Sequence, residues 1–540
     1  MKNIFNSISV RRNKYNTFNL SFENKLSCNM GQLVPVMVQD VLPGDRFKVN
    51  TEQIIRLAPL STPMMQRVDV YFHYFYVPLR LIWDDFEKFI TGGVDGKQSP
   101  VSPFHEIYAG HKSLFNPGSL LDYLGYPSID IPSPNCFNVD ALPIRAYNLI
   151  YNNYYRDQNV PDDFAPVPKG SGFEQYTYED ENGDTQTCTL NELCQLRYRN
   201  WKKDYFTSAL PFAQRGPAVQ IPLVADNKLI FNPDGRTYTY VNGEEPTGNS
   251  PVELARGSFV DGDNQVVNID NSQNLEVSST WEDGTITDLR YAFKVQEWLE
   301  RMARGGSRYI EQIKAFFGVN GDDYRLQRPI YLGGGKSPVV VSEVAQTSQT
   351  TSSSPQATLA GAGTNVSTNF AFNRSFKEHG FVMCIMSIMP KASYFQGVPR
   401  KYLRRDKFDY FWPQFAHIGE QPIYNQELFA QATPHGIYDS DGLVEDNVNN
   451  ETFGYTPRYA EYRFNHDEVH GEFRDTLDNW HMARKFANLP TLNSEFLQCD
   501  DSSSYRPFAV TDDTVEHFYC QIYHKIIATR QIPRYGSPSL

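Results

Sequence analysis

The sequence predicts an all-β protein with short helices in its loops, and three observations lead to this fold class. Three long stretches carry the residue patterns of strands, at 68–77, 381–389 and 518–526. Aromatic residues, which favour strands, form 14% of the 540-residue chain. The few helical patterns interrupt the strand-rich chain and do not alternate with strands, which disfavours a parallel α/β sheet.

Turn and strand signals follow one another along the chain. Residues 42–45 (Leu-Pro-Gly-Asp) predict a tight turn, because proline presets φ and glycine tolerates φ above zero. Residues 68–77 are β-branched or aromatic on both faces and end at Pro78, which indicates a strand inside a sandwich. Residues 381–389 form another apolar run, and residues 518–526 alternate along the strand with a period of two.

Three stretches predict helices. Residues 143–156 form the first. Residues 288–303 place apolar side chains at helical spacing after Thr287, a candidate N-cap, and a pair of glycines follows them. Residues 307–317 predict a shorter helix that ends at Gly318.

Two stretches differ from the rest in composition. Residues 226–288 carry a net charge of −9 and are rich in Asn, Gly, Ser and Thr, which predicts a solvated insertion. Residues 345–372 are small and polar without charges, which predicts a flexible or extended loop.

Composition excludes several classes of protein. The net charge of −13 disfavours binding to nucleic acid through overall charge, so such contacts require local patches. Seven scattered cysteines without a C-x-x-C pair disfavour disulfide scaffolds and zinc ribbons and favour a reducing compartment. No apolar run reaches the ~18 residues of a membrane span, and no signal peptide is recognisable. We therefore expect a soluble protein made in the cytoplasm, without a membrane span.

Two motifs suggest chemistry, and neither is supported by its surroundings. Gly333–Ser337 (GGGKS) resembles part of a phosphate-binding loop, but Ile330 replaces the first glycine and an apolar strand-like run follows, so we predict a glycine-rich turn. His466 and His470 have the i, i+4 spacing of zinc proteases, with Asp467 between them. The residues on either side of this pair predict strand and loop, which favours two polar histidines in a loop over a metal-binding helix. We predict no catalytic residue, no metal site and no cofactor.

Three clusters of cations remain. The first 22 residues contain Lys2, Arg11, Arg12 and Lys14 and no carboxylate. A second cluster surrounds Trp201 and consists of Arg197, Arg199, Lys202 and Lys203. The third lies among Tyr402, Phe408 and Tyr410 and consists of Arg400, Lys401, Arg404, Arg405 and Lys407. Interleaved cations and aromatic rings suit single-stranded nucleic acid, although a solvated face or an interface stays open for each cluster. The predicted nucleic-acid-binding residues are Lys2, Arg11, Arg12, Lys14, Arg404 and Arg405.

Short motifs occur in order along nearly the whole chain, at residues 31–35, 41–45, 75–83, 204–211, 214–216, 305–309, 326–329, 332–334, 457–462 and 533–536. They read Gly-Gln-Leu-Val-Pro in the first and Pro-Arg-Tyr-Gly in the last. In these motifs the sequence resembles the major capsid protein of microviruses, small tailless phages with circular single-stranded DNA. The long central insertion is similar to that of the gokushovirus-like branch.

The resemblance implies a single antiparallel eight-stranded jelly roll of the viral capsid type, with large loop insertions that contain short helices. It implies a structural protein of the virion, present as one copy per asymmetric unit of a small icosahedral (T=1) shell around the single-stranded DNA genome. A small basic DNA-packaging protein is the implied partner, and the family supplies no catalytic residues.

Charge and the resemblance together suggest how the chain is divided. Residues 1–22 are expected from their charges to be a basic arm, and residues 23–540 are expected from the resemblance to be the jelly-roll domain. Residues 226–288 are expected from both to be an acidic surface protrusion within it that contacts a host receptor. The alternative function is a carbohydrate- or receptor-binding β-sandwich protein of a phage particle.

Overall fold

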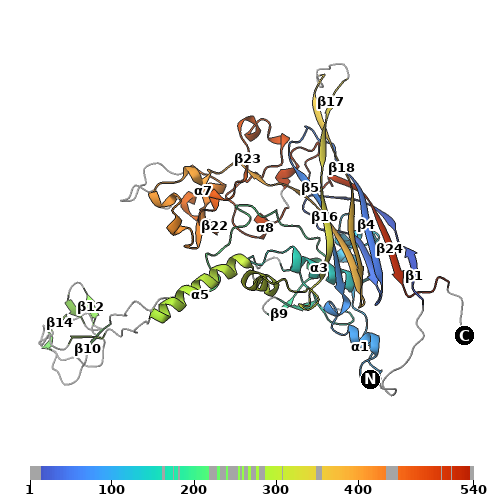
Figure 1. Ribbon diagram of the computed structural model, residues 1–540, viewed down its shortest axis with the longest axis horizontal. Helices are drawn as coiled ribbons and strands as arrows, with labels where there is room; N and C mark the ends of the chain where they lie inside the picture. Colours follow the sequence, from blue (N-terminus) through green and yellow to red (C-terminus); the bar gives the residue numbers. More distant parts are fainter. Residues whose placement is uncertain are drawn as a thin grey trace. The chain divides into compact units, whose positions relative to one another are not determined.

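The computed structural model describes residues 14–160, 164–173, 176–180, 183–217, 286–306, 308–347, 356–432, 448–499, 502–512 and 514–535, together with short strands between 228 and 278. The chain divides into two compact units. One contains residues 1–213 and 302–540, and the other contains residues 214–301. Figure 1 shows the elements along the chain.

Two large antiparallel sheets lie in the larger unit. The first sheet consists of β1 (Asn16–Asn19), β2 (Phe22–Cys28), β4 (Arg46–Leu57), β17 (Val340–Ala345), β18 (Leu359–Ser375) and β24 (Phe518–Arg530). The second consists of β3 (Val34–Val41), β5 (Val68–Pro78), β16 (Ile330–Pro338) and β19 (Gly380–Pro390). In the first sheet, β24 pairs with β1, β2 and β4, β4 also pairs with β18, and β18 pairs with β17. In the second sheet the strand order is β16-β5-β19-β3.

Shorter elements lie in the connections of this unit. The helices are α1 (Phe86–Thr91), α2 (Leu120–Tyr123), α3 (Ala141–Tyr154), α4 (Leu190–Leu193), α6 (Tyr309–Gln312), α7 (Asn425–Leu428) and α8 (Ser494–Leu497). Paired short strands are β6 (Phe104–Tyr108) with β7 (Cys136–Asp140), β8 (Thr177–Glu179) with β9 (Thr185–Thr187), β20 (Ser393–Tyr394) with β23 (Asp467–Glu468), and β21 (Glu420–Tyr424) with β22 (Thr452–Pro457).

The described residues of the smaller unit include six short strands and most of one helix. The strands are β10 (Lys228–Phe231), β11 (Thr239–Tyr240), β12 (Glu253–Ala255), β13 (Ser258–Val260), β14 (Val266–Asn268) and β15 (Leu275–Ser278). Helix α5 (Ile286–Gly305) leads from this unit back into the larger one. Much of the predicted insertion at 226–288 lies outside the described residues. Among the helices in the described ranges, none combines the length and apolar character needed to cross a membrane.

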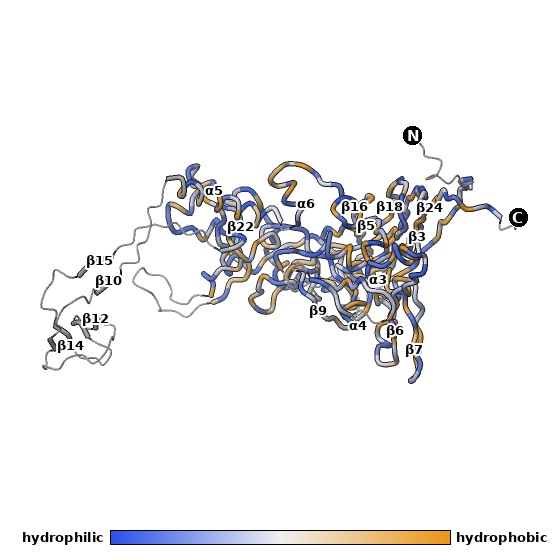
Figure 2. Tube along the Cα trace, turned by 90° about the horizontal axis from the view of Figure 1, so that it is seen from below, coloured by the Kyte–Doolittle hydropathy of each residue, from blue (hydrophilic) through white to orange (hydrophobic). Residues whose placement is uncertain are grey.

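The main core lies between the two sheets. Alternate residues of β24, such as Phe518 and Ile522, are fully buried and meet Phe72 and Tyr74 of β5 in this core. The other face of β5 and β19 packs against α3 in a second core that includes Phe75. Hydrophobic residues recur along these strands (orange in Figure 2). The two central strands are therefore buried on both faces, which explains their unbroken apolar sequences.

Most of the predicted elements are confirmed. The strands predicted at 68–77, 381–389 and 518–526 are β5, β19 and β24. The predicted helices correspond to α3, α5 and α6, although α5 begins one residue before the expected cap Thr287. A π-helical turn at Ile313–Phe317 continues α6 and ends at Gly318, as predicted. The 42–45 turn is closed by the Asp45 N–H, which donates to the carbonyl oxygen of Leu42 at 3.0 Å.

Two predictions of irregular structure are wrong. Residues 359–372 of the expected loop belong to β18, which pairs with β4 on one side and β17 on the other. At its buried Gly363 a Cβ atom would lie 2.6 Å from Leu57 Cδ2, so the glycine lets the Leu57 side chain pack directly against the strand. The Gly333–Ser337 segment is not a turn but part of β16, where a β-bulge follows Tyr331.

Candidate functional site

The predicted nucleic-acid-binding residues differ in their surroundings. Lys2, Arg11 and Arg12 lie outside the described residues, and Lys14 is exposed just before β1. Arg405 is also exposed. Lys14 and Arg405 are therefore open to solvent and to any partner that approaches their faces.

Arg404 is held by neighbouring rings. Its guanidinium carbon lies 5.1 Å from the centre of the Tyr410 ring and 4.5 Å from that of Tyr462. Its side chain is 14% exposed, and Nη2 lies 4.0 Å from the Glu461 carboxylate. The side chain of Arg404 thus joins two aromatic residues of the fold, and Arg405 is the more accessible of the two arginines.

Several large apolar side chains between residues 402 and 464 are exposed, and two of them, Tyr410 and Tyr462, contact Arg404. We call this group the 402–464 patch, and its members, each 44–66% exposed, are Tyr402, Phe408, Tyr410, Phe411, Trp412, Ile418, Tyr462 and Phe464. The ring centres of Phe411 and Tyr462 are 6.1 Å apart. Exposed aromatic surface of this extent is typical of an interaction site. The sequence cluster contained the first three members, but it gave no indication that Tyr462 lies beside Arg404.

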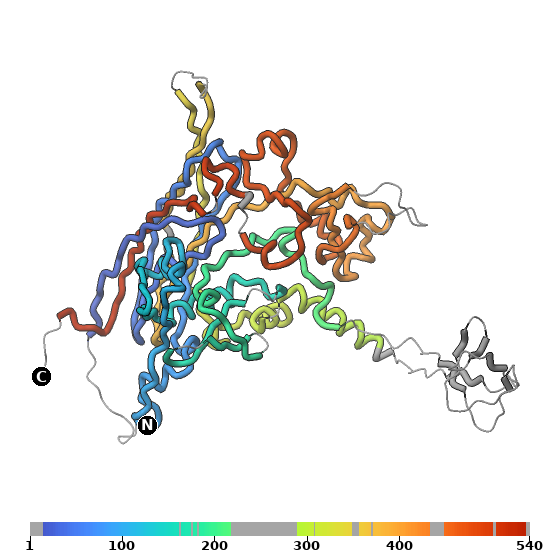
Figure 3. Tube along the Cα trace, turned by 180° about the vertical axis from the view of Figure 1, so that it is seen from behind, coloured from blue at the N-terminus to red at the C-terminus, as the bar shows by residue number. Residues whose placement is uncertain are grey.

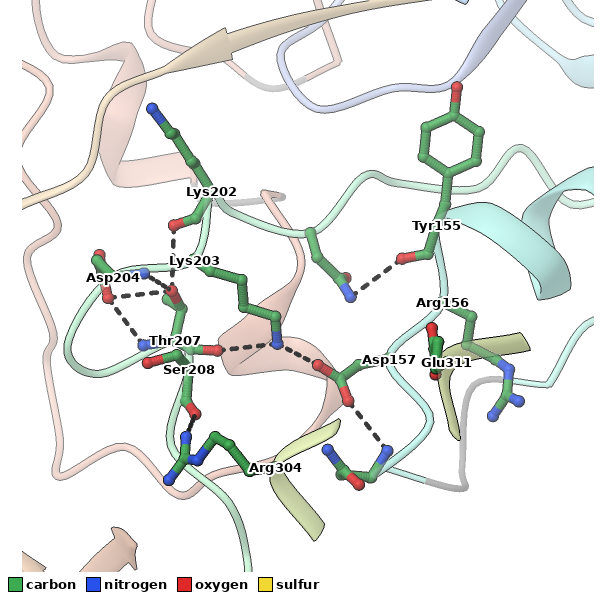
Figure 4. A network of polar contacts seen from close by, with 12 residues as sticks. Tyr155, Arg156, Asp157, Lys202, Lys203, Asp204, Thr207, Ser208, Arg304 and Glu311 are labelled. Atoms are coloured by element: carbon green, nitrogen blue, oxygen red, sulfur yellow. Dashed lines mark hydrogen bonds and ion pairs between the residues drawn. The ribbon is translucent and has the colours of Figure 1, made fainter. Parts of the chain in front are cut away.

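A polar network holds part of the second basic cluster (Figure 4). The Lys203 ammonium pairs with the Asp157 carboxylate and donates to the carbonyl oxygen of Thr207 at 3.1 Å. Asp204 accepts hydrogen bonds from the backbone N–H groups of Phe206 and Thr207 at 3.0 and 2.8 Å. Lys203 is therefore part of a tightly bonded turn that joins the cluster to the chain after α3.

The Asp157 carboxyl is ionised at neutral pH. Burial acts to raise its pKa, but the Lys203 ammonium and the Asn159 N–H outweigh burial, so the pKa lies below its ordinary value.

Two other members of the second basic cluster have surroundings that differ from those of Lys203. Arg197 is buried and donates to the carbonyl oxygen of Glu192 at 2.7 Å. Lys202 is exposed and points away from the network (Figure 4).

Comparison with known proteins identifies the family. Residues 5–540 match the family described as "Capsid protein (F protein)". The chain belongs to this capsid protein family. Capsid protein VP1 of Chlamydia phage 1 is 35% identical over 604 residues, which cover 100% of this chain and 98% of the phage protein.

Two further relatives of this capsid protein match over almost their whole lengths. Capsid protein VP1 of Bdellovibrio phage phiMH2K is 33% identical and covers 99% of this chain and 96% of its own length. Capsid protein VP1 of Spiroplasma virus 4 is 30% identical and covers 95% and 93%. The predicted membership of the microvirus major capsid family, in its gokushovirus-like branch, is confirmed by these matches. A capsid role is therefore favoured over the carbohydrate- or receptor-binding alternative.

The two spaced histidines of the capsid protein lie in different environments. His466 is half-buried beside Phe206, with ring centres 5.4 Å apart, and burial lowers its pKa. His470 is exposed, and its Nε2 lies 2.9 Å from the Glu468 carboxylate. Over the described part of the chain, no group of three or more His, Cys, Asp or Glu side chains is placed to hold a metal ion.

Proposed function

We propose that copies of this capsid protein assemble into a small icosahedral T=1 shell, with one copy per asymmetric unit, around a circular single-stranded DNA genome. The observation that carries the proposal is the family match over residues 5–540. The role is structural, and it involves no catalytic step.

The fold supports a viral jelly roll of eight strands as the building block. Four strands of the first sheet follow the order β2-β24-β4-β18, and the second sheet follows β16-β5-β19-β3. Every pairing within these sets is antiparallel, and consecutive strands such as β4 and β5 lie in opposite sheets. Alternation between two packed sheets is the pattern expected of such a double-sheet fold.

The 402–464 patch is proposed as a contact between copies. Replacing Trp412, Ile418 and Phe464 together with serine should reduce the yield of particles about tenfold or more, because exposed aromatic anchors contribute strongly to interfaces. The melting temperature of the unassembled chain should fall only slightly, because all three side chains are about half exposed, although the Trp412 indole loses its hydrogen bond to the Lys407 carbonyl oxygen at 2.8 Å. Electron microscopy and sedimentation of the assembled protein measure the yield.

Val94→Ser is the matched control, because Val94 is fully exposed and lies outside the patch. Particle yield should be unchanged in this variant. Normal assembly of the triple variant would place the contacts between copies elsewhere on the surface.

The basic arm is proposed to contact the genome, together with Arg405, while a small basic packaging protein neutralises further phosphates. Four cations precede the first carboxylate, Glu23. Replacing Lys2, Arg11, Arg12 and Lys14 with glutamine should lower the DNA retained in particles, because phosphate contacts are lost. The DNA-to-protein absorbance ratio of purified particles measures this. Unchanged retention would mean that the arm contacts a neighbouring subunit instead.

The acidic segment 226–288 is proposed to face the exterior and to contact the host surface. Its net charge of −9 is costly to bury without partners, and the DNA inside a shell is itself negative. Replacing residues 230–284 with a Gly/Ser linker should leave particles intact and reduce their adsorption to host cells. Normal adsorption would make the segment a tolerated loop, and failed assembly would make it part of the shell.

A further inference from the structure

A row of rings lies beside the second basic cluster, on the outer face of the second sheet. Tyr71, His73 and Phe75 alternate along β5 and share the face opposite the core between the sheets. Tyr331 of β16 is the register partner of Phe75, with ring centres 5.6 Å apart. Tyr155, which directly follows α3, stacks on His73 at 5.9 Å.

These rings line a cavity of about 750 Å³, which we call the β5 groove. Its volume is within the range of ligand sites in proteins. Phe75 and Trp201, which also line it, are buried, whereas Tyr331 is 42% exposed. The groove therefore offers at least one open aromatic face on which a planar ligand can stack.

The charge of the groove is positive. Arg199, Lys202, Lys203 and Lys336 line it, and none of the described residues that line it is acidic. Lys203 is paired with Asp157, and Lys336 lies 3.9 Å from an Asp69 carboxylate outside the lining. Lys202 has no ion-pair partner in the described part of the chain. A positive cavity in a chain of net charge −13 calls for an anionic ligand.

Two inner residues of the groove are fixed by contacts within it. Arg199 stacks 4.2 Å above the Tyr71 ring and donates to the Ser387 hydroxyl at 2.9 Å. His73 Nδ1 lies 2.8 Å from the Tyr155 hydroxyl. Burial, and then Arg199, lowers the pKa of His73 to about 4, so its ring is neutral at pH 7. Contacts within the groove thus hold the inner residues in place, and the exposed Lys202 and Lys336 can reach a ligand.

Single-stranded DNA combines the two features that this groove recognises, because it presents phosphates and unpaired, stackable base faces. A neutral sugar would not use the lysines. We propose that the β5 groove binds unpaired bases of single-stranded DNA, with Tyr331 as the open stacking surface and with Lys202 and Lys336 as phosphate contacts. This proposal rests on the function proposed above, in which the shell encloses such a genome.

Fluorescence anisotropy with a labelled oligothymidine tests the groove in the full-length chain. Tyr331→Ala should weaken binding about 5- to 100-fold, as expected for loss of one base-stacking ring. Tyr331→Phe keeps the ring and should bind as the unmodified chain does. The double variant Lys202→Gln/Lys336→Gln should lower the slope of log affinity against log salt by about 1.4, because two phosphate contacts are lost. A duplex of the same length should bind more weakly than the single strand.

Tyr108→Ala and Lys112→Gln remove an exposed ring and an exposed cation outside the groove, and both should leave affinity unchanged. An affinity of Tyr331→Ala for the oligothymidine equal to that of the unmodified chain overturns the proposal. Loss in the lysine variant alone overturns it too, because the groove would then bind any polyanion without stacking. Competition by a neutral oligosaccharide at equal concentration would instead identify a sugar site. Thermal unfolding of each variant separates loss of binding from loss of fold.

Ultraviolet crosslinking of intact particles separates this inference from the proposed function. DNA should crosslink to peptides that contain Tyr71 or Tyr331. Particles that contain DNA and crosslink only elsewhere, for example in the basic arm, overturn the groove and leave the capsid function standing. Failure of the unmodified chain to form DNA-containing particles would contradict the proposed function instead.

Discussion

Replacing Gly31 with alanine is expected to prevent folding, with a loss of more than about 4 kcal/mol in the free energy of unfolding. Gly31 has a φ of +73°, and an added Cβ would lie 1.9 Å from the carbonyl oxygen of Cys499. The clash cannot be relieved by rotating a side chain. The Gly31 N–H donates to the carbonyl oxygen of Ile388 at 2.9 Å. The Arg199 N–H donates to the carbonyl oxygen of Gly31 at 2.7 Å, and the Cys499 N–H donates to that of Arg199 at 2.9 Å. Separating these segments would break that ladder.

Gly96→Ala is the matched control for this substitution. Gly96 also has a positive φ, +66°, but no atom lies within 4 Å of the added Cβ. The Gly96→Ala chain should therefore lose only about 1–2 kcal/mol of unfolding free energy, from backbone strain alone. Soluble yield and urea unfolding compare the two chains. Equal stability of Gly31→Ala and Gly96→Ala would contradict the packing described around Cys499.

Replacing Arg400 with methionine is expected to cost about 3–5 kcal/mol of unfolding free energy at neutral pH. Arg400 Nη1 lies 2.8 Å from the Glu427 carboxylate, whose side chain is 2% exposed. Tyr205 and Tyr424 donate hydrogen bonds to that carboxylate at 2.8 and 2.9 Å, but neither donor carries a charge. Without the guanidinium, Glu427 loses its ion-pair partner and remains buried.

The loss in Arg400→Met should shrink as the pH falls. Burial raises the pKa of the Glu427 carboxyl, and Arg400 opposes that rise. Removing Arg400 therefore moves the folded-state pKa further above the unfolded value of 4.5. Protonation of Glu427 stabilises the folded variant. This stabilisation is fully present below the unfolded pKa and is lost as the pH rises through the folded pKa. Urea unfolding at a series of pH values from 4.5 upwards measures this slope.

Two further chains check the cause. Arg400→Met/Glu427→Gln removes the buried charge as well and should recover most of the lost stability, with little remaining pH dependence. Lys112→Met breaks the exposed Lys112–Asp130 pair, whose side chains are 57% and 80% exposed. It should cost at most about 1 kcal/mol. Equal losses for Lys112→Met and Arg400→Met would show that burial of Glu427 is not the cause.

Strands whose own residues carry the pattern could be predicted from the sequence. Strands β5 and β19 are apolar on both faces because one face meets the opposite sheet and the other meets α3. Strand β18 gave no such signal, because its buried positions include Gly361, Gly363 and Asn365. Glycines there accommodate side chains of neighbouring segments, so the information that makes β18 a strand lies in residues such as Leu57.

Candidate sites were predicted only as far as their members are close in sequence. The cations around Trp201 were recognisable as a cluster, but the rings that complete the β5 groove come from β5, β16 and the chain after α3. The opposite error occurred at Arg404, whose charge was visible in the sequence but whose contact with Tyr462 was not. Non-local packing decides in both cases which cations are available to a ligand.

The position of β24 sets the time at which this protein can fold on the ribosome. Figure 3 shows this strand, in red, among the blue strands of the first part of the chain, and it pairs with β1, β2 and β4. The register partners Leu57 and Phe518 are about 460 residues apart, which corresponds to about 20–90 s of synthesis. During that interval the inner face of β4 has no completed sheet around it. Only a chain translated through residue 530 can complete the first sheet, so we expect truncated products to leave this core open.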